Sequence, residues 1–115
     1  MRIYISIPIS GHDLSTQQAE AEKIAEKIKA LGHEPVNPFD TPEAPPEMSE
    51  KERYAYYMGE DIKRLLLCDG AYFHPRWAKS KGCRIENNAA VTCGLEIFYT
   101  FSDMMPIDEI IPKTI

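Results

Sequence analysis

The sequence contains no long hydrophobic run and no cluster of basic residues. None of its apolar runs approaches the roughly 20 residues that a membrane-spanning helix needs, and its first residues have the pattern of a strand rather than of a signal peptide. The 13 Lys and Arg are outnumbered by 18 Asp and Glu, which gives a formal charge of −5. We therefore expect a cytoplasmic protein that binds neither membranes nor a nucleic acid polymer, although its charge does not exclude a single nucleotide.

Cysteine is also scarce, and the spacing of the three cysteines matches no metal site. Cys68, Cys83 and Cys93 are an odd number and lie in apolar surroundings, so we expect them to be free, buried thiols. A structural disulfide and a zinc site are not expected. We also expect no organic cofactor.

Strand patterns and helix patterns alternate along the 115 residues, a length that suits one domain with its own core. Alternating β-branched and aromatic residues predict four strands, at 2–7, 34–37, 70–73 and 96–99. Apolar residues at helical spacing predict three helices, which lie between residues 13 and 32, 49 and 67, and 80 and 94. Asp13 or Ser15 is expected to cap the first helix, and Ser49 with Glu52 forms a capping-box pattern at the second.

This alternation is typical of an α/β fold with a doubly wound parallel sheet. We predict a small flavodoxin-like or Rossmann-like sheet of four to five strands in the order 2-1-3-4, with helices on both faces. The loops after the first and third strands, 8–13 and 74–79, should then meet in a crevice. The proline-rich segment 39–48 is expected to form a stiff surface loop that could cover a site. The apolar segment 100–115 is expected to pack on this domain or on a neighbouring subunit, with a short fifth strand as one option.

Two carboxylates are predicted to point toward the core side of the second and third helices. Glu86 shares a helical stripe with Cys83, Ala90 and Cys93. Asp61 lies within the apolar stripe of the preceding helix, which contains Tyr54, Tyr57, Met58, Ile62 and Leu65. A buried carboxylate is costly unless it is paired or neutralised, so both need an explanation. One could act as nucleophile and the other as acid or base, as in retaining glycoside hydrolysis.

Polar residues near the same crevice suit an anion. The backbone amides of Ser80 and Gly82 lie at a helix start, where a phosphate can bind, and Arg84 could assist. The first-strand loop adds Ser6, Ser10 and Gly11.

Several of these residues also have an ordinary structural explanation. Asp61 could pair with Arg64 or bond to helix ends, and Glu86 could be satisfied by Tyr4 or Arg84 without catalysis. Ser80 is expected to cap a helix in any case. His74 could be a general acid or base, but a loop residue is the simpler interpretation. The same choice, between stacking on a base and packing in the core, applies to Trp77, Tyr54 and Tyr57.

Four motifs occur in order along nearly the whole chain. They are YISIPISG at 4–11, LGHEPVNP at 31–38, the helix with Asp61 that ends in Leu67-Cys68-Asp69, and W-x-x-S-x-G-x-x-x-E at 77–86 followed by Gly94. With these motifs the chain resembles the nucleoside 2-deoxyribosyltransferase-like superfamily, and within it a small bacterial and phage group.

The resemblance implies glycosyl transfer from a nucleoside or nucleotide. Glu86 would attack C1′ to form a glycosyl ester, and Asp61 would protonate the departing base. Ser80, six residues before Glu86, would hold a 5′-phosphate together with nearby amides. Water as acceptor gives an N-glycosidase, and a second base gives a transferase. The residues expected to bind substrate are Tyr4, Ser6, Pro8, Ser10, Gly11, Trp77, Ser80, Gly82 and Arg84.

Two features differ from the superfamily pattern. Ile7 stands where the most similar group usually has glycine, which should narrow the first loop. Lys79, Lys81 and Arg84 occupy the region in which many of the transferases carry an acidic residue. The carboxylate that holds the ribose in those transferases is therefore missing here, which argues against transferase activity.

Three hypotheses about function follow from the sequence. The first is an enzyme that cleaves an N-glycosidic bond or transfers 2-deoxyribose. The second is a module that binds a nucleotide in the same crevice without cleaving it. The third is a structural homo-oligomer with a vestigial site. The partners expected are a small nucleoside or nucleotide and further copies of the chain, in a homodimer or a higher homo-oligomer.

Overall fold

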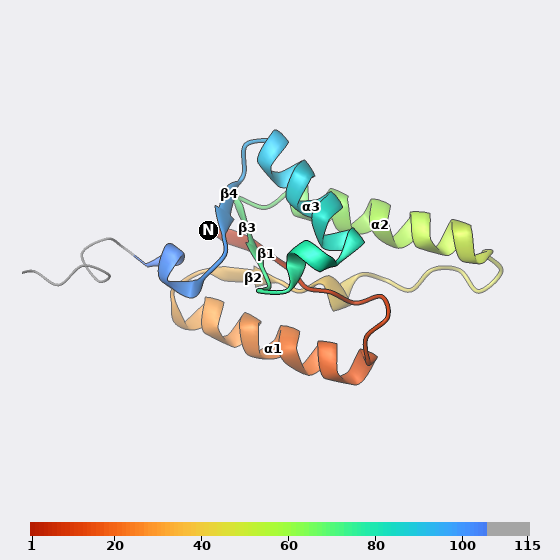
Figure 1. The fold of residues 1–115 in the computed structure, drawn as a ribbon, viewed down its shortest axis with the longest axis horizontal. Helices are drawn as coiled ribbons and strands as arrows, with labels where there is room; N and C mark the ends of the chain where they lie inside the picture. Colours follow the sequence, from red (N-terminus) through yellow and green to blue (C-terminus); the bar gives the residue numbers. More distant parts are fainter. Residues whose placement is uncertain (106–115) are drawn as a thin grey trace, which may run out of the picture.

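A central parallel sheet organises the computed structural model, which describes residues 1–105 (Figure 1). Its strands are β1 (Arg2–Ser6), β2 (Glu34–Val36), β3 (Gly70–Phe73) and β4 (Glu96–Phe98). They lie in the order β2-β1-β3-β4, and each neighbouring pair is parallel. The α/β fold class and the strand order predicted from the sequence are therefore confirmed.

Three helices cover the two faces of this sheet (Figure 1). Helix α1 (Leu14–Ala30) lies on one face, and α2 (Glu50–Leu66) and α3 (Lys81–Thr92) lie together on the other. Short 3-10 helices follow three of the strands: η1 (Pro38–Asp40), η2 (Trp77–Lys79) and η3 (Phe101–Met104).

Side-chain caps fix where the helices begin. Asp13 accepts a hydrogen bond from the Thr16 amide at the start of α1, and Ser49 forms the predicted capping box with Glu52 at the start of α2. Ser80 accepts one from the Cys83 amide at the start of α3. Each cap satisfies an amide that has no partner within its helix, so the local sequence sets these three boundaries.

Alternate side chains of β1 point to opposite faces of the sheet and have different roles there. Ile3 and Ile5 are fully buried on the α1 side, in a cluster that includes Ile28. Tyr4 and Ser6 are equally buried but face the α2 and α3 side, because successive side chains of a strand point to opposite faces. One short strand therefore supplies apolar packing to one layer and hydroxyl groups to the other.

Gly70 allows β3 and β4 to pair closely. A Cβ atom at this position would lie 2.8 Å from a ring carbon of Phe98 and 3.0 Å from the Glu96 carbonyl oxygen. A larger residue at this position would therefore require the Phe98 ring and the β4 backbone to shift.

One prediction about burial is wrong. Cys68 and Cys83 are buried free thiols as expected, but Cys93 is exposed. Helix α3 ends at Thr92, so Cys93 no longer follows the helical stripe. On α2 only Leu65 is buried, and Tyr54 is 45% exposed, because the helix extends past the sheet (Figure 1).

The end of the described chain continues the core on the α1 face. Met104 is buried there, and no strand occurs within residues 100–105. The predictions for residues 106–115, which include a fifth strand, lie outside the described residues. No helix within residues 1–105 has the length and apolarity to span a membrane.

Candidate active site

A cavity of about 950 Å³ lies at the carboxyl ends of β1 and β3. Its walls come from the loop after β1, the loop between η1 and α2, the first half of α2, and the segment from Arg76 to Glu86. Tyr4, Asp61 and Glu86 all line it. The crevice predicted between the loops after strands 1 and 3 therefore exists.

Two hydroxyl groups from β1 hold the Glu86 carboxylate. Glu86 is only 6% exposed. The Tyr4 hydroxyl donates to its Oε2 at 2.6 Å, and the Ser6 hydroxyl donates to its Oε1 at 2.7 Å. Tyr4 and Ser6 point to the same face of the strand because they are two residues apart. Each carboxylate oxygen thus has its own donor.

Burial raises the pKa of Glu86 to about 7, and the nearby charge of Asp61 adds to this rise. The hydrogen bonds from Tyr4 and Ser6 act in the opposite direction, because they stabilise the ionised form. Burial and the two carboxylates also raise the pKa of Tyr4 well above its usual value. Tyr4 therefore keeps its proton and stays a donor to Glu86.

Asp61 is held in a different way, by the loop between η1 and α2. The Thr41 hydroxyl donates to Asp61 Oδ1 at 2.9 Å and accepts a hydrogen bond from Arg64 Nη1 at 2.7 Å. Burial raises the pKa of Asp61, while the Thr41 hydrogen bond and the Arg64 charge partly oppose the rise. The pairing of Asp61 with Arg64 considered from the sequence thus runs through a threonine.

Basic side chains lie along one side of the cavity. Arg76, Lys79 and Lys81 line it next to Ser80 and Gly82. The Ser80 hydroxyl is used by the Cys83 amide at 3.3 Å, which is the helix cap that the sequence predicts. The arrangement places positive charge beside the start of α3, where an anion would be favoured.

The cavity brings together most of the residues predicted to form a site. The members of its wall are Tyr4, Pro8, Ser10, Asp61, Ser80, Gly82 and Glu86. Ser6 lies behind Glu86 and contacts it directly. Gly11, Trp77 and Arg84 are not part of the wall. Trp77 instead packs against Phe73 and Tyr99, with ring centroids 5.7 Å away in each case.

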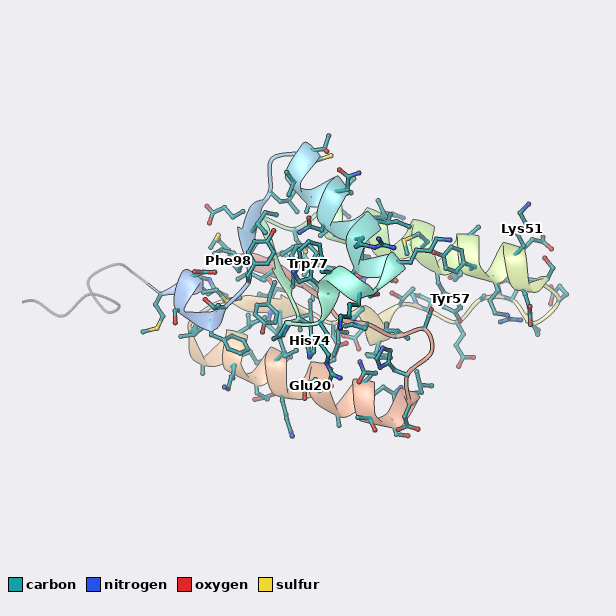
Figure 2. The ribbon with its side chains drawn as sticks, viewed as in Figure 1. Glu20, Lys51, Tyr57, His74, Trp77 and Phe98 are labelled. Carbon is teal, nitrogen blue, oxygen red and sulfur yellow. The ribbon has the colours of Figure 1, made fainter. Side chains whose placement is uncertain are left out.

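His74 is buried and is not part of the cavity wall. Its Nδ1 accepts a hydrogen bond from the Arg76 amide at 3.1 Å, and its Nε2 lies 3.7 Å from the Glu20 carboxylate on α1 (Figure 2). Burial lowers the pKa of His74. These contacts fix the turn after β3, which favours the loop-residue interpretation. Among residues 1–105, no three His, Cys, Asp or Glu side chains gather as a metal site.

The sequence reasoning missed two residues that shape the cavity. Thr41 connects Asp61 to Arg64, the partner considered from the sequence. Gln17, which is buried on α1, donates its amide to the Pro8 carbonyl and so fastens the loop after β1. The sequence did contain a signal for Gln17, because this polar residue lies on the otherwise apolar face of its helix. Thr41 had none, because its partner lies twenty residues away.

Two comparisons with known proteins give a match, one by structure and one by sequence family. The solved structure of 2-deoxyribosyltransferase from the psychrotolerant bacterium Bacillus psychrosaccharolyticus is similar, with a TM-score of 0.64 over 91% of this chain and 82% of that one. The sequence identity is 15%, so this similarity concerns the fold alone. No curated protein matches the chain. The family described as "Domain of unknown function (DUF4406)" matches residues 1–99, and the chain belongs to this family.

Proposed function

We propose that the protein cleaves the N-glycosidic bond of a nucleoside or nucleotide, with Glu86 as nucleophile and Asp61 as acid. The observation that carries this proposal is that two carboxylates from different helices, each with a raised pKa, line one cavity. Glu86 would attack C1′ and form a glycosyl ester. The C1′–N bond would break, its electron pair would leave with the base, and the base would take the Asp61 proton. Water would then release the sugar, or a second base would accept it.

Substrate binding would place the protons where this reaction needs them. Attack requires ionised Glu86, although burial raises its pKa to about 7 in the free protein. Positive charge that develops at C1′ favours ionised Glu86, because an opposite charge nearby lowers a carboxyl pKa. A base packed against Asp61 removes water from it, which favours the protonated acid.

The rest of the cavity supports a nucleotide as the substrate class. Arg76, Lys79 and Lys81 suit a 5′-phosphate beside the start of α3. Tyr54 and Tyr57 line the part of the cavity formed by α2 and offer aromatic surface to a base. The fold shared with a 2-deoxyribosyltransferase supports a nucleoside as the reacting unit.

Base release is the direct test of this proposal. The protein should be incubated with purine and pyrimidine ribonucleosides, 2′-deoxynucleosides and their 5′-monophosphates, and free base quantified by chromatography. A second base added to the mixture detects transfer. We expect release by the wild type and none by Glu86→Ala, with a 2-fluoro-arabinosyl substrate leaving an adduct on Glu86 that mass spectrometry identifies. Saturable binding without release, unchanged in Glu86→Ala, would contradict the proposal.

A binding module is the second candidate. The three basic side chains can hold a phosphate without any chemistry, and Tyr4 and Ser6 satisfy Glu86 without a ligand. Calorimetry with uncleaved nucleotides separates this candidate from a vestigial site, because only a binding module or an enzyme would show saturable heat and a raised melting temperature.

Self-association is a further part of the proposal. Apolar side chains are exposed at the end of α2 and on α3, where Leu67 is 66% and Val91 is 54% exposed. Burying such side chains between copies of the chain would stabilise a homodimer or a larger assembly. Sedimentation over a range of concentrations measures this, and a monomer at every concentration would contradict it.

A further inference from the structure

Three hydrogen bonds fasten the loop between η1 and α2 along that helix. They come from residues four apart on α2, so they share one helical face. The bonds are Thr41 Oγ1 to Asp61 Oδ1 at 2.9 Å, Ala44 N to Tyr57 Oη at 2.9 Å, and Arg53 Nη2 to Pro46 O at 3.4 Å. Figure 2 shows Tyr57 between the helix and the loop. The bond at Asp61 differs from the other two because it ends on a residue proposed to react.

We propose that Thr41 and Arg64 are positioning residues that determine which oxygen of Asp61 carries the acidic proton. This inference rests on the proposed function. Arg64 can only donate hydrogen bonds, so the Thr41 oxygen must accept from Arg64 Nη1. Ionised Asp61 can only accept, so the single hydroxyl hydrogen of Thr41 is directed to Asp61 Oδ1. Donation by Arg64 makes the Thr41 hydroxyl a stronger donor and a weaker acceptor, which favours the same direction when Asp61 is protonated.

The direction of this chain decides where the Asp61 proton lies. A protonated carboxyl has one oxygen that accepts and one that bears hydrogen. Since Oδ1 accepts from Thr41, the proton belongs on Oδ2. When the C1′–N bond breaks and its electron pair leaves with the base, Oδ2 gives up this proton. The new negative charge of Asp61 then meets a donor and a guanidinium that are already in place, which is electrostatic preorganisation.

The charges around Asp61 predict the effect of removing the chain. Arg64 and Glu60 act on Asp61 from its own helix. Tyr4 on β1 and Glu86 on α3 also interact with the Asp61 charge. Among these groups Arg64 is the one with a positive charge. The Thr41 hydrogen bond and the Arg64 charge both stabilise ionised Asp61. Loss of the Thr41 hydroxyl removes the first of these, so the pKa of Asp61 should rise.

Titration of Asp61 in the free protein tests the arrangement without any turnover. Carbon-13 labelled aspartate gives the carboxyl signal, and Asp61→Asn assigns it. We expect Thr41→Val to raise the Asp61 pKa and Thr41→Ser to restore it. Thr92→Val, which removes an exposed hydroxyl on α3, should leave it unchanged. An unaltered titration in Thr41→Val would overturn the inference, and Arg64→Met provides the same test if that variant does not fold.

Base release then tests the catalytic consequence. For a base that must be protonated as it leaves, Thr41→Val should slow release roughly tenfold, which is the effect of losing one hydrogen bond to a charged group. A 7-methylpurine nucleoside leaves without a proton from the protein, so its rate should change little. If the rate fell equally for both substrates, the role of Thr41 would be to fasten the loop and not to position the Asp61 proton. If the wild type releases no base, the proposed function fails, and the titration alone decides the hydrogen-bond arrangement.

Discussion

Glu86 and Asp61 line one cavity but are held by different parts of the molecule. Both oxygens of Glu86 accept hydrogen bonds from β1, a central strand with a neighbour on each side. Asp61 Oδ1 accepts one from Thr41, on a loop that runs beside α2 beyond the sheet (Figure 1). The residue proposed to form a bond is thus fixed by the rigid centre of the fold, and the residue proposed to move a proton is fixed by a surface segment.

This contrast has a physical consequence. Burial is the largest influence on both carboxyl groups and raises both pKa values. For Glu86 the opposing influences are two neutral hydroxyl donors, whereas for Asp61 they are one hydroxyl and a full positive charge. Changes on β1 should therefore act on the nucleophile, and changes in the loop should act on the acid.

The largest expected effect comes from Glu86→Gln. This variant keeps the size of the side chain and removes the nucleophilic carboxylate, so base release should fall by roughly 10⁴-fold or more for every substrate. Glu22→Gln, on the exposed side of α1, is the matched control and should keep wild-type rates. Steady-state release assays measure both. A rate for Glu86→Gln within tenfold of the wild-type rate would show that Glu86 is not the nucleophile.

Asp61→Asn should have a smaller effect that depends on the substrate. Loss of a general acid typically lowers a rate by about 10² to 10⁴-fold. The loss should apply to bases that need a proton and should nearly vanish for a 7-methylpurine nucleoside. Rates for the two substrates, measured side by side, would show whether Asp61 acts on the leaving base. A uniform loss would instead assign Asp61 to substrate binding.

Unfolding as a function of pH should reveal the cost of burying Glu86. Its pKa is about 7 in the folded protein against 4.5 as its ordinary value, so the folded state holds more protons between these pH values. The contribution of Glu86 to stability is then highest below pH 4.5 and falls as the pH rises to 7, by about 3 kcal/mol. Glu86→Gln removes this dependence. Denaturant unfolding at several pH values gives the difference in free energy of unfolding between the two proteins. This difference should be independent of pH below pH 4.5 and should change between pH 4.5 and 7.

The sequence predicted the elements better than their contacts. Caps such as Asp13 and Ser80 are local, so the helix starts could be read directly. The inward direction of Glu86 followed from helical spacing, and Tyr4 was named as a partner. The exposure of Cys93 depended on where α3 ends, and the role of Thr41 depended on a loop folding back on α2. Such contacts are set by tertiary packing, which periodicity does not encode.

The smallest effect, and the sharpest test of the contrast, is expected from Ser6→Ala. The variant removes the donor to Oε1 and leaves Tyr4 on Oε2, so the ionised form of Glu86 loses stabilisation and its pKa rises. A hydrogen bond to a charged group is worth roughly 1.5 kcal/mol or more, which should move the acidic limb of kcat, the parameter that reports the enzyme–substrate complex, upward by about one pH unit. The rate at high pH should change much less.

The alkaline limb and the Asp61 carboxyl titration should stay in place in Ser6→Ala, because Ser6 contacts Glu86 and not Asp61. Thr41→Val should do the reverse. Ser102→Ala, which removes an exposed hydroxyl on η3, is the control for loss of a serine. If Ser6→Ala moved both limbs together, the two carboxylates would titrate as one coupled pair, and the division between a nucleophile held by the sheet and an acid held by the loop would be wrong.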